Sequence, residues 1–449
     1  MRTPFRKSHG KITFVLYNKP FPCGGHCLYC FTSKGFTKST TPNEDTLLAK
    51  ENDWNGRIQL EKRFGLYGLT KGSGLKCDFA VKGDSFARHD ADYLRTYTKE
   101  LYDFLNGRPA ATLQQAAEWQ KKAPDRCVTY KIETRPDQID EQMCRLFMEL
   151  GITTVEIGVQ SLNDHILKYN RRGHDSQLVA DTTKLLRKFG FEVCYQMMVG
   201  LPGSSYEIDL EILASTLWKN EFAPDALKVY PCLLLRKEIA DQEPLRKLYH
   251  TKQWSPMSLD TYLSLWRESY PHIPRYVHIN RIQRIITPEK IECGITTEID
   301  RHQFDDLSDC LWQRSPAQRF DNLDRIYSDY RIEFHSQGNE RFCVDAAYGN
   351  HTSLGYGRLD FISPHTALIR DIRVLGNMLK VGEKSCHHKG SQHIGIGSAM
   401  LSAMENKALS TGKKHCFVRP SFGTVGWFEE RGYRPYDNYF YVKHLSTNR

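Results

Sequence analysis

Three cysteines near the beginning of the chain have a spacing that suits a metal centre. In the stretch FPCGGHCLYC, Cys23, Cys27 and Cys30 form the pattern C-x3-C-x2-C. A structural zinc site normally closes with four protein ligands, whereas these thiolates have no adjacent fourth partner. Thiolates are also the natural ligands of iron-sulfur clusters. The pattern therefore favours a 4Fe-4S cluster with one iron left open to a substrate, and a zinc knuckle with a distant fourth ligand is the alternative.

Charged and polar residues stand at the ends of several predicted strands. They occur in the stretches KGDSF, IETRPD and EIGVQS. The charged and polar residues are Lys82, Asp84, Glu133, Arg135, Glu156 and Gln160, and Gly83 lies between the first two. A charged side chain at the end of a buried parallel strand costs free energy unless it is paired or faces a ligand. We therefore expect this set to line a cofactor site. For IETRPD, an internal ion pair at the strand ends is the alternative.

A glycine-containing loop precedes a predicted helix late in the chain. It has the pattern Q-x-x-G-x-G and comprises Gln392, His393, Ile394, Gly395, Ile396 and Gly397. Glycines let the backbone approach a pyrophosphate, and the exposed amides at a helix N-terminus favour its negative charge. The order of strand, loop, helix and strand resembles the acetyl-CoA-binding motif of GNAT acetyltransferases. Coenzyme A is therefore favoured over an ordinary turn.

Six short β-rich runs alternate with helical patterns in the first part of the chain. The runs are residues 12–19, 76–83, 127–135, 154–161, 192–200 and 226–234. Several of the helical patterns between them end at a glycine, as helix C-termini prefer. Apolar strands that alternate with helices indicate a parallel sheet covered by helices. We expect an α/β fold with an open, partial (β/α)6 barrel, whose active site faces the carboxyl ends of the strands.

The pattern changes after residue 285. Residues 286–324 have few strand signals and are interpreted as a connector. Residues 325–449 contain a new β-rich series with helical patterns at SAMLSAMENKALSTG and GTVGWFEERG. The sequence therefore predicts a first domain over residues 1–285, the connector, and a smaller α/β domain over residues 325–449.

The composition is typical of a globular, multidomain protein. The chain has 449 residues, 40% hydrophobic residues and a net charge of +9. It has no run of 18 or more apolar residues and no apolar N-terminal stretch, which predicts a cytoplasmic protein without a membrane partner. The 13 cysteines are then expected as ligands or buried thiols rather than disulfides. Seven basic residues precede the first acid, Glu44, and either a phosphate-bearing partner or a solvated surface explains them.

The cysteine motif resembles the signature of the radical S-adenosylmethionine (radical SAM) superfamily, with Tyr29 directly before the last cysteine. All motifs together resemble the Elp3 family, which joins a radical SAM domain to a GNAT domain. The motifs run nearly end to end and are NKPFPCGGHCLYC, KCDFAVKGDSF, CVTYKIETRPD, EIGVQS, RRGH, YQMMVGLPG, ALKVYPCLLLR, RIQRIITP, RDIRVLG, SQHIGIGSAML and FEERGY. The resemblance implies a radical SAM barrel over residues 1–285 and a GNAT acetyltransferase-like domain over residues 325–449.

This resemblance also implies an enzyme that modifies C5 of the wobble uridine of tRNA. In the family's scheme, S-adenosyl-L-methionine (SAM) chelates the open iron and is cleaved to a 5'-deoxyadenosyl radical, which abstracts hydrogen from the methyl group of acetyl-CoA. The carbon radical adds to C5, and thioester hydrolysis leaves a carboxymethyl group. The implied ligands are a 4Fe-4S cluster, SAM, acetyl-CoA and tRNA, with accessory subunits or a second copy of the chain as further partners.

The resemblance assigns roles to individual residues. Lys82, Gly83 and Asp84 stand where the superfamily places a loop that contacts the amino group of SAM. The residues implied in acetyl-CoA binding are Lys76, Asp371, Ile372, Arg373, Val374, Phe428 and the glycine-containing loop from Gln392 to Gly397. Within this set, residues 371–374 would pair with the thioester arm, and the loop would hold the pyrophosphate. Lys76 would join the three cysteines as a catalytic residue.

Several positions depart from the family pattern. The spacing before Cys27 is shorter, KGDSF replaces GGTF, the basic N-terminal region is short, and Trp427 and Phe428 replace paired tyrosines. These departures keep two alternatives open: a radical SAM enzyme that uses acetyl-CoA on a small molecule, and a homologue that binds tRNA and coenzyme A without turnover. A lysine acetyltransferase is disfavoured, because no general base is obvious in the sequence and the cluster would be idle.

A second set of ligand-type residues lies in the connector and before the glycine-containing loop. It comprises Cys293, Cys310, Cys386, His387 and His388. Borderline ligands of this kind suit zinc, so a zinc site that bridges the two domains is one hypothesis. Scattered surface histidines and buried cysteines are the alternative.

Overall fold

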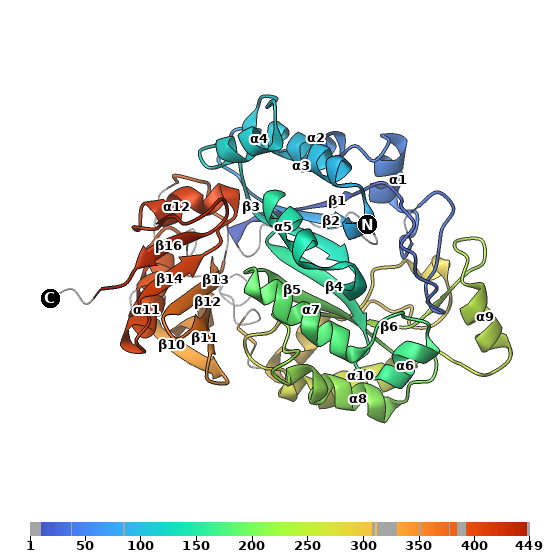
Figure 1. Cartoon of the computed structure of the whole chain (residues 1–449). Helices are drawn as coiled ribbons and strands as arrows, with labels where there is room; N and C mark the ends of the chain where they lie inside the picture. The colour runs from blue at the N-terminus through green and yellow to red at the C-terminus, as the bar shows by residue number, and fades with distance from the viewer. Residues whose placement is uncertain are drawn as a thin grey trace.

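The computed structural model describes residues 10–36, 38–83, 86–307, 310–311, 330–349, 352–376, 378–383 and 392–446. Within these ranges the chain forms two seven-stranded sheets and one two-stranded pair (Figure 1). The strands of the first large sheet lie between Ile12 and Arg281, and those of the second lie between Tyr330 and His444. None of the described helices combines the length and the apolar character that crossing a membrane requires.

The first large sheet is parallel throughout and forms the predicted partial barrel. Its strands, in spatial order, are β1 (Ile12–Tyr17), β2 (Lys76–Lys82), β3 (Arg126–Thr134), β4 (Thr154–Gln160), β5 (Glu192–Val199), β6 (Ala226–Pro231) and β8 (His278–Arg281). Only the last residue of β4 is not buried, as expected for a strand with both faces covered. The prediction of an open α/β barrel is confirmed. The short strand β8 was not predicted, because the four residues HINR give little periodic signal.

Helices cover the first sheet. They are α1 (Glu44–Glu51), α2 (Gly56–Leu66), α3 (Ala91–Asn106), α4 (Leu113–Gln120), α5 (Glu141–Glu149), α6 (Asp164–Tyr169), α7 (Ser176–Lys188), α8 (Tyr206–Ala214), α9 (Glu243–His250) and α10 (Leu259–Ser269). Local signals set their ends: the Asp90 side chain accepts hydrogen bonds from the first backbone amides of α3, and Gly107 ends this helix with a φ of 78°. The apolar face of α3, which includes Leu94 and Leu101, is fully buried in the first core.

The second large sheet belongs to the smaller domain. Its strands, in spatial order, are β10 (Tyr330–Gln337), β11 (Arg341–Tyr348), β12 (Thr352–Ser363), β13 (Thr366–Val374), β14 (His415–Val418), β16 (Tyr441–His444) and β15 (Arg434–Pro435). Strands β13 and β14 are parallel and pair from Thr366 only as far as Ile369, so the last part of β13 is not paired with β14. The helices are α11 (Ile396–Ser410) and α12 (Val425–Glu429). Met400 and Met404 of α11 pack into a core with Val344 and Ile369.

Part of the predicted connector folds onto the first domain. Strand β9 (Ile291–Cys293) pairs antiparallel with β7 (Leu234–Leu235), which follows the barrel strand β6. Ile295 and Phe304 are buried in the same hydrophobic core as the barrel. This stretch therefore contributes packing and is not an exposed linker.

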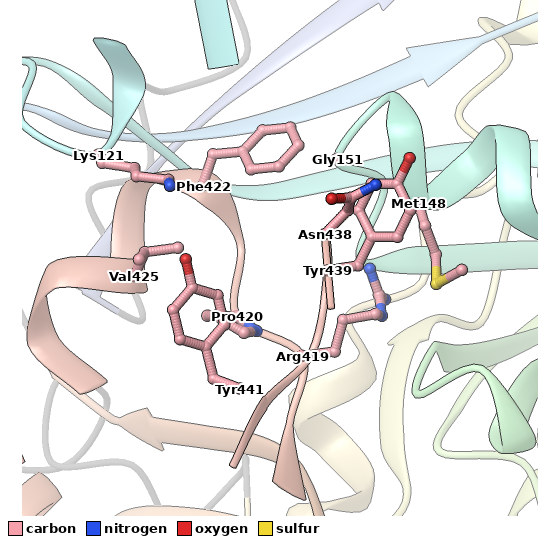
Figure 2. Close-up of a pocket in the computed structure, with 10 residues that line it drawn as sticks. All are labelled: Lys121, Met148, Gly151, Arg419, Pro420, Phe422, Val425, Asn438, Tyr439 and Tyr441. Atoms are coloured by element: carbon pink, nitrogen blue, oxygen red, sulfur yellow. The ribbon is translucent and has the colours of Figure 1, made fainter. Parts of the chain in front are cut away.

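The smaller domain packs against the amino ends of the barrel strands. Arg419 donates hydrogen bonds to the carbonyls of Ile152 and Gly190, at 2.8 and 3.3 Å, just before β4 and β5 begin. A cavity of about 20 Å³ beside Arg419 is lined by residues of both domains, among them Met148 and Tyr441 (Figure 2). This volume has room for about one water molecule and is too small for a cofactor.

Candidate active site

The three cysteines lie in the loop that follows β1, at the carboxyl end of a barrel strand. The charge of Arg135 acts on both Cys27 and Cys23, and Tyr29 lies beside both Cys27 and Cys30, so the three thiols share one neighbourhood. The three sulfur atoms do not all lie within 4.8 Å of one another. Zinc with four thiolate ligands would hold its sulfur atoms about 3.8 Å apart, given Zn–S bonds of about 2.3 Å. The three sulfur atoms are therefore not arranged around a single ion, and thiolates are also the natural ligands of an iron-sulfur cluster.

Two buried arginines make Cys27 a better ligand. Arg172 Nη1 lies 3.5 Å from Cys27 Sγ, and Arg135 Nη1 lies 3.8 Å from it. Burial alone would raise the pKa of the Cys27 thiol, but Arg172 and then Arg135 hold this pKa below its ordinary value. The thiolate, which is the form that binds metal, is therefore stabilised.

A charged cluster fills the interior of the barrel. Lys82 Nζ lies 2.6 Å from Glu133 and 2.9 Å from Glu156, and Lys228 contacts the same two carboxylates. These side chains come from β2, β3, β4 and β6. Side chains of strands that are not neighbours meet only inside the curve of the sheet, so the cluster lies in the barrel interior. Although burial would raise it, Lys228 and Lys82 hold the pKa of Glu156 well below its ordinary value.

The sequence predicted Lys82, Glu133 and Gln160 as cofactor-binding residues. Lys82 and Glu133 do face the barrel interior, where 23% of the Glu133 side chain is exposed. Gln160 ends β4 with a φ of 73°, a conformation that costs free energy in a residue with a Cβ. Gly83 follows β2 and lies next to Asn18. Asp84 lies outside the described residues.

Lys76 contacts the glycine-containing loop across the domain interface. Its Nζ lies 2.8 Å from Gln392 Oε1 and 2.9 Å from His393 Nε2. Burial lowers the pKa of Lys76 to about 8, against a weaker opposing effect of Glu383. The barrel thus presents an ammonium group to the loop that is predicted to hold a pyrophosphate.

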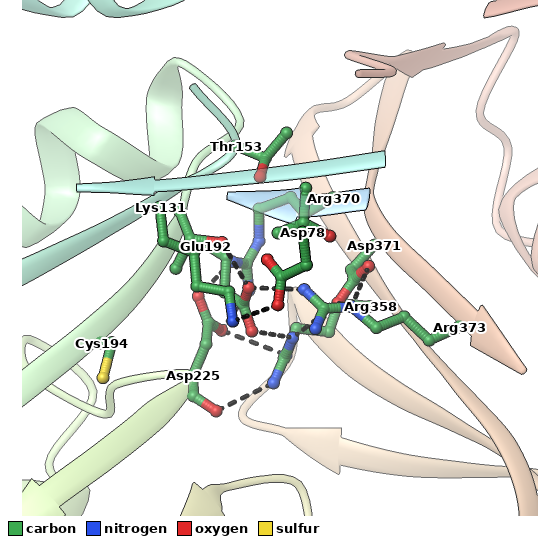
Figure 3. A network of polar contacts seen from close by, with 12 residues as sticks. Asp78, Lys131, Thr153, Glu192, Cys194, Asp225, Arg358, Arg370, Asp371 and Arg373 are labelled. Carbon is green, nitrogen blue, oxygen red and sulfur yellow. Dashed lines mark hydrogen bonds and ion pairs between the residues drawn. The ribbon is translucent and has the colours of Figure 1, made fainter. Parts of the chain in front are cut away.

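Strand β13 is joined to the barrel by buried ion pairs (Figure 3). Arg373 Nη2 lies 2.6 Å from Glu192, at the start of β5, and Arg370 Nη1 lies 2.7 Å from Asp225, just before β6. Arg358 of β12 lies between them, within 3.3 Å of Asp225 and 3.5 Å of Glu192. Although burial opposes it, Arg373 and Arg358 lower the pKa of Glu192 to about 2.

The residues predicted on β13 divide between its two faces. The side chains of Asp371 and Arg373 pair with each other at 2.9 Å within the ion-pair network. Ile372 and Val374 pack against the core of the smaller domain. The backbone of residues 371–374 is not paired with β14, although the Val374 carbonyl accepts a hydrogen bond from Gln392 Nε2 at 3.5 Å.

The glycine-containing loop leads directly into α11. Gly395 is the N-cap residue of α11 and has a φ of 96°, and Gly397 lies in the first turn. Ile396 is buried at 1% exposure, Ile394 packs against the core, and Phe428 is buried against Tyr433 at 7% exposure. Any contact of Ile396 or Phe428 with coenzyme A would therefore depend mainly on the backbone.

The two predicted sites lie at opposite ends of one barrel. The cysteine loop follows the carboxyl end of β1, whereas Lys76 and Glu192 begin β2 and β5. The charged cluster of Lys82, Glu133, Glu156 and Lys228 lies inside the barrel. The barrel and its charged cluster therefore separate the two predicted sites.

The hypothesis of a bridging zinc site is not tested by the described residues. Cys386, His387 and His388 lie outside them. The Cys310 thiol donates a hydrogen bond to the Val277 carbonyl at 2.9 Å within the core. The described group that could hold a metal ion is a different one, Glu333, His335 and Asp345 on β10 and β11. Zinc stays a prediction.

Several residues of the site were not predicted from the sequence. Arg172 was noted only as part of the RRGH motif, and Lys228, Gln196 and Glu192 were not singled out. Gln196 Nε2 lies 2.8 Å from Glu133. The sequence does contain a signal for Lys228. This lysine lies inside the apolar stretch ALKVYP, where its burial costs as much free energy as that of the charged residues at the other strand ends. Their partners, by contrast, could not be identified from sequence spacing.

Comparisons with known proteins agree with this geometry. Residues 91–214 match the model of the Radical SAM superfamily. The chain is 29% identical to the tRNA uridine(34) acetyltransferase of Dehalococcoides mccartyi (strain CBDB1) over 444 residues, which is 94% of this chain and 93% of the relative. It is 24% identical to Elongator complex protein 3 of Homo sapiens over 470 residues, covering 96% and 84%. The solved structure of archaeal Methanocaldococcus infernus Elp3 with an N-terminal deletion has the same fold, with a TM-score of 0.80, 22% identity, and coverage of 98% and 100%.

Proposed function

Since this chain is similar to Elp3 proteins along nearly its whole length, we propose that it is a radical SAM enzyme that modifies the wobble uridine of tRNA. The observation that carries the proposal is the cysteine loop at the carboxyl end of β1, with Arg135 and Arg172 directed at Cys27. Relatives with the name tRNA uridine(34) acetyltransferase support the substrate. Accessory subunits, a second copy of the chain and a cytoplasmic location remain predictions.

The residues of the barrel suit the cofactors that this function needs. Cys23, Cys27 and Cys30 would hold a 4Fe-4S cluster, and the carboxylate of Glu133 would accept hydrogen bonds from the amino group of SAM. When bound, cluster and SAM supply one-electron chemistry that yields a carbon radical. The protein's part is to orient the ligands and to exclude water from the barrel interior. The neighbouring charges of Lys82 and Lys228 hold Glu133 in place.

The smaller domain would hold acetyl-CoA. Residues 371–374 are not paired with β14, and an extended thioester arm could pair with their backbone along that side. The glycine-containing loop at the N-terminus of α11 and the ammonium group of Lys76 suit the pyrophosphate. The acetyl end would then point toward the barrel interior. We infer that the product is a carboxymethyl group on C5 of uridine.

The proposal is tested by analysis of tRNA nucleosides. Protein reconstituted anaerobically with iron and sulfide is incubated with SAM, acetyl-CoA, dithionite and bulk tRNA. We expect carboxymethyluridine in the digested tRNA, detected by mass spectrometry, and none when SAM or acetyl-CoA is omitted. Release of 5'-deoxyadenosine without a modified nucleoside would favour a small-molecule substrate. Binding of tRNA and acetyl-CoA without any consumption of SAM would favour a non-catalytic homologue.

Replacement of Lys76 by methionine is expected to weaken acetyl-CoA binding about tenfold. The substitution removes one charge-assisted hydrogen bond to a phosphate, and such a bond contributes about 1.5 kcal/mol. Because the pKa of Lys76 is lowered to about 8, the wild-type ammonium group is lost as the pH rises through that value. Affinity should therefore fall above about pH 8 in the wild type and stay level in Lys76→Met. Isothermal titration calorimetry measures both effects.

The matched control for this prediction is Lys62→Met. Lys62 is exposed on α2 and loses the same charge away from the loop. Its affinity for acetyl-CoA should equal that of the wild type. If Lys76→Met binds acetyl-CoA as tightly as the control does, Lys76 has no part in the coenzyme A site.

A further inference from the structure

Two guanidinium groups are directed at one cysteine of the proposed cluster site. Arg172 Nη1 and Arg135 Nη1 lie 3.5 and 3.8 Å from Cys27 Sγ. Arg172 is 6% exposed and Arg135 is 8% exposed, so solvent screens neither charge well. Both distances are within the range of N–H···S hydrogen bonds. Cys27 therefore has two buried cations beside its sulfur atom.

Other contacts fix both guanidinium groups in place. Arg172 Nη2 donates to the Gly158 carbonyl at the end of β4. Arg135 donates from Nε and Nη2 to the two carboxylate oxygens of Asp137, each at 2.8 Å, and from Nη2 to the Arg172 carbonyl at 2.7 Å. Arg135 thus binds the backbone of Arg172, and the Arg172 side chain binds the backbone of β4. Their orientation toward Cys27 does not depend on the cysteine alone.

The surrounding backbone leaves room for these side chains. A Cβ atom on Gly158 would lie 2.7 Å from Arg172 Nη2, and a Cβ atom on Gly25 would lie 2.5 Å from Arg135 Nη1. Both distances are shorter than van der Waals contact. A side chain at either position would therefore push the facing guanidinium group out of its present place.

No carboxylate oxygen forms an ion pair with Arg172 within the described part of the chain, although the charge of Arg172 acts on Asp137 from a longer distance. Asp137 pairs with Arg135, whereas the contacts of Arg172 are the Gly158 carbonyl and the Cys27 sulfur, and its Nε has no hydrogen-bond partner. Burial of a cation without an ion-pair partner costs free energy. An anionic group at Cys27, such as a thiolate bound to an iron-sulfur cluster, would offset this cost.

We propose that Arg172 and Arg135 are positioning residues that hold Cys27 and raise the reduction potential of the cluster bound there. The inference rests on the cluster in the proposed function. One electron from an external donor reduces the cluster without forming or breaking a bond, and the reduced cluster carries one more negative charge. Nearby cations and N–H···S bonds stabilise that state more than the oxidised one. The arginines thus make the electron transfer that begins the reaction easier.

The test is a redox titration of the reconstituted full chain, followed by electron paramagnetic resonance, without tRNA or acetyl-CoA. In Arg172→Met we expect the ratio of reduced to oxidised cluster at a fixed potential to fall about tenfold, which is about 59 mV for one electron. Arg135→Met should change in the same direction, and Arg172→Lys should lie between Arg172→Met and the wild type. Lys168→Met, which removes an exposed charge from α6, should match the wild type.

Two results would overturn the inference. The first is an unchanged midpoint potential in Arg172→Met and Arg135→Met, each with a full complement of iron. The second applies if Arg172→Met fails to take up iron: unchanged potentials in both Arg172→Lys and Arg135→Met would then contradict it. If the wild type itself takes up no cluster, the proposed function fails instead, so the two failures can be told apart.

Discussion

Replacement of Cys27 by alanine is expected to reduce iron and sulfide incorporation to background and to abolish SAM cleavage. The loop offers three thiols, and a cluster held through three irons cannot lose one ligand without losing its attachment. Cys27 is also the cysteine that both buried arginines contact. Iron and sulfide assays after anaerobic reconstitution measure the first effect. Chromatography of 5'-deoxyadenosine measures the second.

Cys293→Ala is the matched control for this substitution. Cys293 is also a partly exposed, free thiol, and it belongs to the predicted zinc set rather than to the cysteine loop. It should keep its iron-sulfur cluster, and its zinc content also tests the zinc hypothesis. A Cys27→Ala protein that still holds iron and cleaves SAM at the wild-type rate would remove the cysteine loop from the chemistry.

Replacement of Arg358 by methionine is expected to lower the free energy of unfolding by about 3 kcal/mol or more. Arg358 is 1% exposed and lies within 3.5 Å of carboxylate oxygens of Asp225, Glu192 and Asp371. Its loss leaves the buried carboxylates of Asp225 and Glu192 and the half-buried carboxylate of Asp371 with one cation fewer, although Arg370 and Arg373 still pair with them. Urea unfolding followed by circular dichroism measures the change. The substitution also weakens the ion pairs that join β12 and β13 to the barrel, so the rate of acetyl-CoA turnover should decrease as well.

The comparison variant is Arg331→Met, which removes an exposed arginine that pairs with Glu333 on the same strand. An exposed pair contributes less than about 1 kcal/mol, so this variant should unfold close to the wild type. Equal stability of the Arg358 and Arg331 variants would mean that the buried ion pairs do not hold the two domains together.

At acidic pH, the difference in the free energy of unfolding between Arg358→Met and the wild type should become smaller. The pKa of Glu192 is lowered from 4.5 to about 2 in the folded protein. A carboxylate with a lowered pKa stabilises the fold above its unfolded pKa, and this contribution is lost as the pH falls through the folded value. The wild type therefore loses stability between about pH 5 and pH 2. In the variant, the weakly compensated carboxylates take up protons at higher pH, so the difference in stability shrinks over this range.

The candidate site could be predicted where a residue type is informative alone. Three cysteines in close spacing indicate a metal centre, and a charged residue at the end of a buried strand indicates a ligand or an ion pair. The family resemblance implies that Lys76 and the glycine-containing loop both serve acetyl-CoA, and in the structure Lys76 Nζ lies 2.8 Å from Gln392 Oε1 of that loop.

The ion pairs between the domains could not be predicted in the same way. Glu192 and Arg373 are separated by 181 positions, and nothing in either local sequence identifies the other as its partner. The same holds for Arg172, whose contact with Cys27 spans 145 positions. Short strands such as β8 were missed because four residues are too few for an alternating pattern.

In the proposed function, the cysteine loop and the smaller domain act on the same acetyl-CoA from opposite ends of the barrel. The tRNA reaction with acetyl-CoA deuterated in its methyl group tests this most directly, through the mass of the 5'-deoxyadenosine released. We expect 5'-deoxyadenosine that has gained deuterium, because the proposed reaction takes hydrogen from the acetyl methyl group. Unlabelled 5'-deoxyadenosine, released while the tRNA is being modified, would contradict it.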